Sequence, residues 1–78
     1  MLRRYKCIKS FLIDLYDENG FYDNKADFVK VGTIWERNEF TNILGGDIHL
    51  ILTDGENKMN WLEISEKTLN EYFKIIEE

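Results

Sequence analysis

Two side chains in this sequence of 78 residues could serve as nucleophile and base, Cys7 and His49. A cysteine activated by a neighbouring imidazole becomes a thiolate nucleophile, so the two could form a catalytic dyad if their strands were neighbours. The alternative is a small buried cysteine and a histidine that faces solvent. His49 is the only histidine, which excludes metal sites with several histidine ligands. We therefore predict no catalytic residue and no enzymatic activity.

The acidic and glycine-rich turns lack the spacing of metal or phosphate sites. Residues 17–23 fail the calcium-loop pattern because Phe21 stands where a ligand is needed. Residues 54–57 are too few to surround an ion. Gly45 and Gly46 precede a strand pattern instead of a helix, so no helix N-terminus follows them to hold a phosphate. We predict no metal and no other cofactor.

Aromatic residues are the best indication of function. The chain contains five phenylalanines, four tyrosines and two tryptophans, more than the thin core of so short a chain can bury. Strand alternation places each tryptophan on the other face of its strand from the neighbouring core residues. Exposed tryptophan and tyrosine are typical anchors of interfaces. Alternatively, the terminal helix covers one sheet face and buries at least one tryptophan. The predicted partner-binding residues are Tyr16, Phe21, Tyr22, Trp35 and Trp61.

Charge is distributed unevenly along the chain, whose net charge is −5. Residues 1–13 contain four basic residues and no acidic one, whereas the rest contains six basic and fifteen acidic residues. The basic cluster could contact phosphates, but the acidic remainder would repel a polyanion, so we do not expect nucleic acid as a partner. We interpret the cluster as lysine and arginine that protect an edge strand from pairing with another chain.

Composition also indicates the compartment. A single cysteine cannot form an intrachain disulfide, which favours a reducing, cytoplasmic environment. No run of 18 apolar residues is present, so we expect no membrane span.

The apolar pattern predicts a single domain over residues 1–78. Residues 4–16 fit a helix or a strand equally well, but a helix would place its cations at the positive N-terminal end, so strand is favoured. Asn19-Gly20 predicts a type I′ hairpin turn, and residues 24–27 read as loop. The predicted strands are 4–16, 28–37, 47–53 and 59–64, with a loop over 38–46.

The later strands and the terminal helix have clearer signals. Gly32 predicts a bulge or bend in its strand. In strand 47–53 the alternation places Ile48, Leu50 and Leu52 inward and His49 outward. Ser65 is a good N-cap for a helix over 66–77.

The order of these elements resembles SH3-like barrels. A first strand is followed by a long hairpin loop at 14–28, and residues 28–34 are similar to the hydrophobic–x–basic–x–Gly stretch that opens the second strand of that fold. The resemblance implies an α+β fold, a small half-open antiparallel barrel with one C-terminal helix. The proline and aromatic cluster of peptide-binding SH3 domains are absent, so recognition of polyproline is not implied.

Three short phrases resemble small uncharacterised proteins of phages, prophages and mobile elements in AT-rich Gram-positive bacteria: residues 5–9, 32–36 and 61–65. This resemblance implies a genomic neighbourhood of host-takeover and anti-defence proteins. We therefore predict a non-enzymatic protein that masks a host protein through its aromatic or its acidic surface. The alternative is a sensor of a small ligand or nucleotide, with a pocket between helix and barrel. Self-association through an uncovered strand edge, giving a homodimer, stays open.

Overall fold

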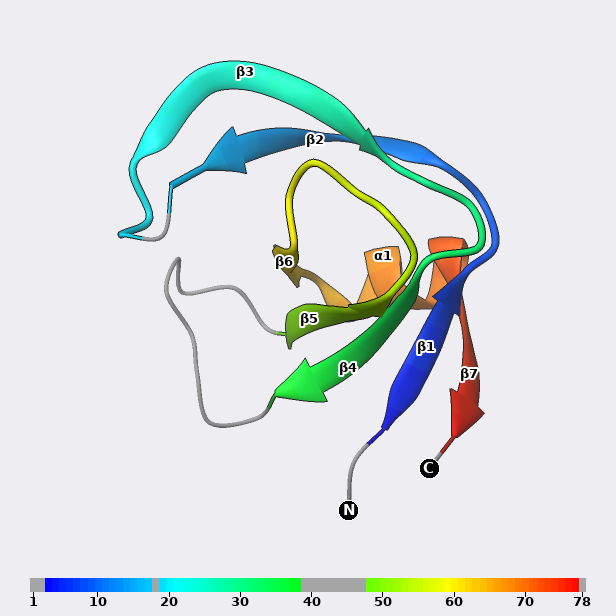
Figure 1. The fold of residues 1–78 in the computed structure, drawn as a ribbon. Helices are drawn as coiled ribbons and strands as arrows, with labels where there is room; N and C mark the ends of the chain where they lie inside the picture. Colours follow the sequence, from blue (N-terminus) through cyan, green and yellow to red (C-terminus); the bar gives the residue numbers. More distant parts are fainter. Residues whose placement is uncertain (1–2, 18, 39–47, 78) are drawn as a thin grey trace.

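The computed structural model describes residues 3–17, 19–38 and 48–77. Within them the chain forms seven strands and one helix, arranged in two open antiparallel sheets that do not close into a barrel (Figure 1). The larger sheet has the order β6-β5-β4-β1-β7, and β2 with β3 forms a separate hairpin. The bounds are β1 Arg4–Cys7, β2 Phe11–Tyr16, β3 Tyr22–Val29, β4 Ile34–Asn38, β5 Ile48–Asp54, β6 Trp61–Ile64, α1 Glu66–Tyr72 and β7 Phe73–Glu77.

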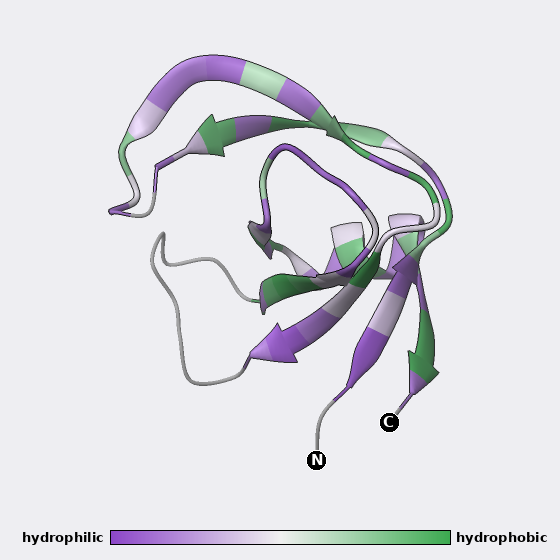
Figure 2. Ribbon diagram, in the orientation of Figure 1, coloured by the Kyte–Doolittle hydropathy of each residue, from purple (hydrophilic) through white to green (hydrophobic). Residues whose placement is uncertain are grey.

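One hydrophobic core joins the two sheets and the helix. The hairpin β2–β3 arches over one face of the larger sheet (Figure 1). The largest fully buried side chain is that of Trp35, and the predicted inward residues Ile48 and Leu50 are buried beside it. Figure 2 shows the contrast between β5, which is largely hydrophobic, and β3, which is mostly hydrophilic and lies at the outer edge. The core therefore depends on the larger sheet, and the hairpin contributes mainly its inner face.

The predicted strand 4–16 is divided between the two sheets. β1 belongs to the larger sheet and β2 to the hairpin. Between them, the amide nitrogens of Ile8 and Lys9 donate to the carbonyl of Tyr72 at 2.8 and 3.4 Å, and the chain bends at this point. The prediction that the basic segment protects an edge strand is wrong, because β1 lies between β4 and β7.

A second bend lies beside the first. The predicted strand 28–37 is interrupted after Val29, and β4 begins only at Ile34. Gly32 has a φ of 93°, a conformation that favours glycine, and its amide donates to the carbonyl of Cys7 at 2.9 Å. The predicted bend at Gly32 is confirmed, whereas the continuous strand is wrong.

The hairpin is longer and its turn is different from the prediction. Residues 24–27, predicted as loop, belong to β3, where Asp27 lies opposite Ile13 of β2. Their polar side chains suggested loop, but main-chain pairing does not require apolar side chains. At the tip, Gly20 has a φ of 85° and its amide donates to the carbonyl of Asp17 at 2.9 Å, so Gly20 closes the turn instead of standing at its centre as a type I′ turn on Asn19-Gly20 requires.

The predicted helix over 66–77 ends early. Ser65 caps it as predicted, since its side chain accepts a hydrogen bond from the amide of Thr68, but the backbone becomes extended at Phe73. Residues 73–77 then pair with β1. Two β-branched isoleucines favour a strand here, and Glu77 would be unfavourable at the negative end of a helix. As a strand residue Glu77 instead lies 3.5 Å from the guanidinium of Arg4.

The remaining elements agree with the prediction more closely. Residues 61–64 form β6 with Leu62 and Ile64 buried, and the predicted strand 47–53 is represented by β5. The predicted loop 38–46 lies outside the described residues apart from Asn38, which ends β4.

A buried hydrogen bond between Thr33 and Trp35 allows a test of the core. The indole nitrogen of Trp35 donates to Thr33 Oγ1 at 2.8 Å, and both side chains are buried. Thr33→Val should lower the free energy of unfolding by about 1–3 kcal/mol, because the indole N–H loses its acceptor. The loss is measured by urea denaturation.

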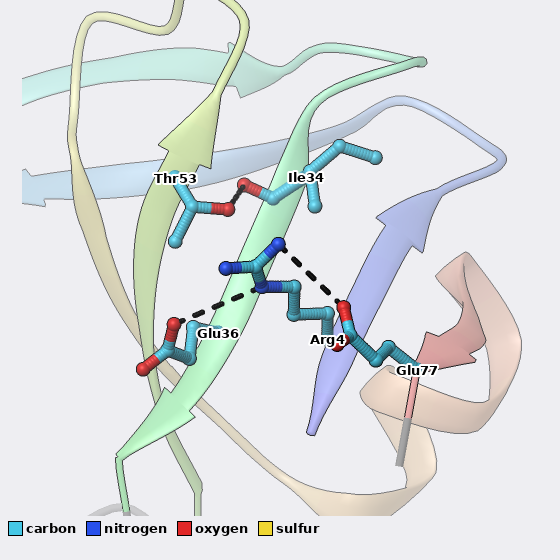
Figure 3. Close-up of polar contacts among 5 residues, drawn as sticks. All are labelled: Arg4, Ile34, Glu36, Thr53 and Glu77. Carbon is cyan, nitrogen blue, oxygen red and sulfur yellow. Dashed lines mark hydrogen bonds and ion pairs between the residues drawn. The ribbon is translucent and has the colours of Figure 1, made fainter. Parts of the chain in front are cut away.

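Thr53→Val is the matched control. The Thr53 hydroxyl donates to the carbonyl of Ile34 at 3.2 Å but is exposed (Figure 3), so this change should cost about 0.5 kcal/mol or less. In a Trp35→Phe background Thr33→Val should cost less, because the indole N–H is then absent and only the hydrogen bond from Thr33 Oγ1 to the Lys30 carbonyl, at 2.6 Å, is lost. Equal losses for the two threonine variants would contradict the assignment.

Candidate functional site

An open groove of about 280 Å³ lies between the tip half of the hairpin and the residues that lead into β6. Its base is apolar, since Leu15 and Met59 are only 5% and 6% exposed. We call it the aromatic groove. It is lined by Leu15, Tyr16, Asp23, Lys58, Met59, Asn60 and Trp61. The groove thus brings together two of the predicted partner-binding residues, Tyr16 and Trp61, from distant parts of the chain.

Two more of the predicted residues lie next to the groove on the hairpin. Tyr22 is opposite Tyr16 in the β2–β3 register, and their rings are 5.7 Å apart between centroids. Tyr22 is 50% exposed and the neighbouring Phe21 is 70% exposed. The Asp17 carboxylate accepts the amide N–H groups of Asn19 and Phe21, so the backbone that presents Phe21 is held in place. These side chains form an ordered aromatic tip beside the groove.

Trp61 is positioned by a buried polar pair. Its ring is stacked on the imidazole of His49, with 5.6 Å between centroids and 10° between planes. His49 Nδ1 lies 3.0 Å from Glu63 Oε2, and the two side chains are 4% and 1% exposed. The prediction that His49 faces solvent is wrong, because its side chain is buried. Alternation gives the correct face of the sheet, but it does not reveal that neighbouring side chains cover that face.

The role of this cluster could have been inferred in part from sequence. A hairpin closed by a turn after Asp54 pairs β5 with β6, and the observed register places His49 opposite Glu63 and Ile51 opposite Trp61. Histidine opposite glutamate on one strand pair is a recognisable cross-strand combination. The information that identifies this cluster is therefore the register of β5 against β6, which the pattern of either strand alone does not show.

Trp35 is not part of this surface. Its side chain is fully buried in the core cluster that also contains Leu69 of α1. Trp35 lies opposite Tyr5 of β1 and Leu52 of β5, which also pack in or against the core, so the core face of β4 is the one that carries Trp35 and not the one that carries Ile34. The prediction that Trp35 anchors a partner is wrong for this reason. The position of Trp35 agrees with the alternative instead, in which one tryptophan is buried in a core that includes the terminal helix.

The hairpin that carries the aromatic tip is acidic. Its described residues include four aspartates and one lysine, namely Asp14, Asp17, Asp23, Asp27 and Lys25. Asp17 and Asp27 accept hydrogen bonds from nearby backbone amides, whereas Asp23 lines the groove. A partner of this surface would therefore meet aromatic rings surrounded by carboxylates.

A second hollow, of about 480 Å³, lies between the hairpin and α1. It is open to solvent, and its lining combines apolar and hydroxyl side chains: Phe11, Leu12, Ile13, Glu63, Ile64, Ser65, Thr68 and Tyr72. The ring of Phe11 packs on that of Tyr72 with 4.6 Å between centroids. This hollow lies where the alternative hypothesis of a ligand sensor expects a pocket.

Cys7 and His49 are not neighbours. β4 lies between the strands that carry them, β1 and β5. The Cys7 thiol is fully buried and donates to the carbonyl of Lys9 at 3.1 Å. Burial raises the pKa of Cys7 above its ordinary value of 9.0, and the hydrogen bond lowers it by a smaller amount. The geometry thus gives Cys7 neither a base nor a lowered pKa.

Comparisons of the chain with protein-family models, curated proteins and solved structures found no match. Among the described residues, no group of three or more histidine, cysteine, aspartate or glutamate side chains is arranged to hold a metal ion. No helix within the described ranges combines the length and the apolar character needed to cross a membrane.

The raised pKa of Cys7 predicts a specific dependence of stability on pH. Below the ordinary thiol pKa of 9.0 the thiol is protonated in both the folded and the unfolded chain. Above it, the unfolded chain releases the proton first, so Cys7 reduces the free energy of unfolding by up to about 1.4 kcal/mol per pH unit.

Cys7→Ala removes this contribution. The stability of the unchanged protein relative to Cys7→Ala, measured by urea denaturation, should fall between about pH 8 and about pH 10. It should be constant at lower pH, where the thiol does not ionise in either state. A difference that rises with pH over this range would indicate a stabilised thiolate and would reverse our conclusion about Cys7.

Proposed function

We propose that this protein is a binding module with an SH3-like architecture. The order of elements along the chain supports the proposal: β1 is followed by the long hairpin β2–β3, by β4 after the bend at Gly32, and by β5 and β6 joined through residues 55–60. The helix α1 and the strand β7 follow, and β7 returns to pair with β1. A half-open barrel is our interpretation of the two open sheets, with the hairpin as the flap that covers the core.

The function we propose is non-enzymatic binding of another protein through the aromatic groove and the adjacent tip. The observation that carries it is the convergence of Tyr16, Tyr22 and Trp61 around one groove, next to a phenylalanine that is 70% exposed. Exposed aromatic side chains are stabilised when a partner removes them from water. Tryptophan and tyrosine also contribute most of the binding energy in many interfaces.

We further propose that the partner is a host protein and that this protein masks it. The resemblance to small proteins of phages and mobile elements suggests this setting, and the single unpaired cysteine suggests the cytoplasm. An acidic hairpin complements a basic surface, such as the nucleic-acid-binding face of a defence nuclease. In this scheme the protein binds no nucleic acid itself and requires no cofactor.

The double variant Phe21→Ser, Tyr22→Ser tests the role of the tip. If these rings anchor the partner, their loss should weaken binding by about 2 kcal/mol or more, which is about 30-fold in the dissociation constant. Binding is measured by calorimetry against candidate host-defence nucleases at low and at moderate salt.

Phe28→Ser is the matched control, because Phe28 is 53% exposed on the same hairpin but lies outside the groove. It should leave the dissociation constant unchanged. Absence of any complex with the nuclease panel at both salt concentrations would count against the masking function. A complex weakened equally by both variants would exclude the groove as its site.

The hollow between β2 and α1 favours a second candidate, a sensor of a small ligand or nucleotide. Its volume of about 480 Å³ falls within the size range of small-molecule pockets. Adding a library of nucleotides and metabolites should then raise the melting temperature for at least one compound. Thr68→Met, which fills the hollow, should abolish the increase, whereas Lys67→Met on the exposed side of α1 should not. A screen without any increase would remove this candidate.

A further inference from the structure

The strand β7 forms one edge of the larger sheet. It pairs with β1 on one side, and no described strand pairs with its other side. Figure 1 shows it as the outermost strand, on the opposite side of the molecule from the hairpin tip. An edge strand of this kind presents unpaired N–H and C=O groups that can bind another strand.

The centre of β7 is apolar. Proteins protect sheet edges with charged residues such as lysine, with prolines, bulges or very short strands, and β7 carries one lysine and one bulge. Between its charged residues lie two adjacent isoleucines, Ile75 and Ile76, which are 41% and 49% exposed. β-branched side chains of this type pack well in sheets, so a second strand could bury their exposed surface.

A bulge makes the charges of β7 complementary to those of a second copy. Arg4 is opposite Glu77 and Lys6 is opposite Lys74, with one extra β7 residue accommodated where the register shifts. Arg4 and Lys6 are two residues apart on β1 and share a face, so Lys74 and Glu77 share that face as well, although they are three residues apart. In a regular strand they would lie on opposite faces.

Two-fold symmetry turns this arrangement into an interface. When β7 pairs antiparallel with β7 of a second copy about a point between Ile75 and Ile76, Lys74 of each copy lies beside Glu77 of the other. The isoleucines of the two copies meet at the centre. Glu77 is available for this contact because its side chain is 61% exposed while it pairs with Arg4 (Figure 3).

We propose that the protein forms a two-fold dimer in which the β7 strands pair and join the two larger sheets. A two-fold interface must be self-complementary, and β7 meets this requirement in its hydrogen-bonding edge, its isoleucines and its charges. The aromatic groove lies at the hairpin and stays free, so a dimer presents two copies of it. This proposal does not depend on the protein-binding function proposed above.

Sedimentation equilibrium over a range of protein concentrations tests the dimer. The unchanged protein should show a reversible monomer–dimer equilibrium. Ile76→Lys introduces a charge at the centre of the interface, and Lys74→Glu places like charges together, so each should raise the dissociation constant about tenfold or more. Because both positions are exposed, circular dichroism should show an unchanged fold.

Three controls distinguish this interface from association through another surface. Ile51→Lys changes an isoleucine of β5 that is 40% exposed, and it should leave the equilibrium unchanged. The exchange Lys74→Glu with Glu77→Lys should restore dimerisation, because the charges are complementary again. The variant Phe21→Ser, Tyr22→Ser should dimerise normally. A protein that stays monomeric at all concentrations, or a dimer that responds to the hairpin variant and not to the β7 variants, would overturn the proposal.

Discussion

The backbone pairing between β1 and β7 holds the first and the last of the described strands in one sheet, and the other elements depend on it. It places Phe73 opposite Cys7, so that both side chains enter the core. It also brings the carbonyl of Tyr72 to the amides of Ile8 and Lys9, where the chain leaves β1 for the hairpin. The path of the hairpin, and with it the position of the aromatic groove, follows from this junction.

The same pairing explains the uneven charge distribution. The basic residues of β1 lie between strands that carry acidic residues, and Arg4 reaches Glu36 on β4 at 3.9 Å and Glu77 on β7 at 3.5 Å (Figure 3). Exposed ion pairs of this kind contribute little to stability. The same register also places Lys6 opposite Lys74, so the charges of β1 do not by themselves select it.

Local signals in the sequence were sufficient for some features of the fold. The cap at Ser65, the bend at Gly32 and the inward face of β6 each depend on residues close in sequence, and all three were predicted. The conformation of residues 73–77 depends instead on β1, which lies about seventy positions away in the sequence. Their apolar spacing fits a helix and a strand alike. A distant partner decided between two conformations that the segment itself allows.

The candidate site was predicted to a similar extent and for similar reasons. Tyr16, Tyr22 and Trp61 were recognised as surface aromatics, but their convergence on one groove requires the three-dimensional arrangement of hairpin and sheet. Alternation correctly separates Trp35 from Ile34, but which of these two faces of β4 enters the core is decided by the neighbouring strands β1 and β5. His49 illustrates the same limit, since its strand pattern contains no information about Glu63.

The junction of β1 and β7 also has a consequence for synthesis on the ribosome. β1 is made before the other described strands, yet one of its two neighbours, β7, is translated after all of them. A nascent chain that has reached only residue 72 has an incompletely paired β1 and a core without Phe73. Contacts between residues so far apart in sequence form slowly and leave apolar surface exposed in the meantime. We therefore expect this protein to complete its fold after translation of β7, in a single late step.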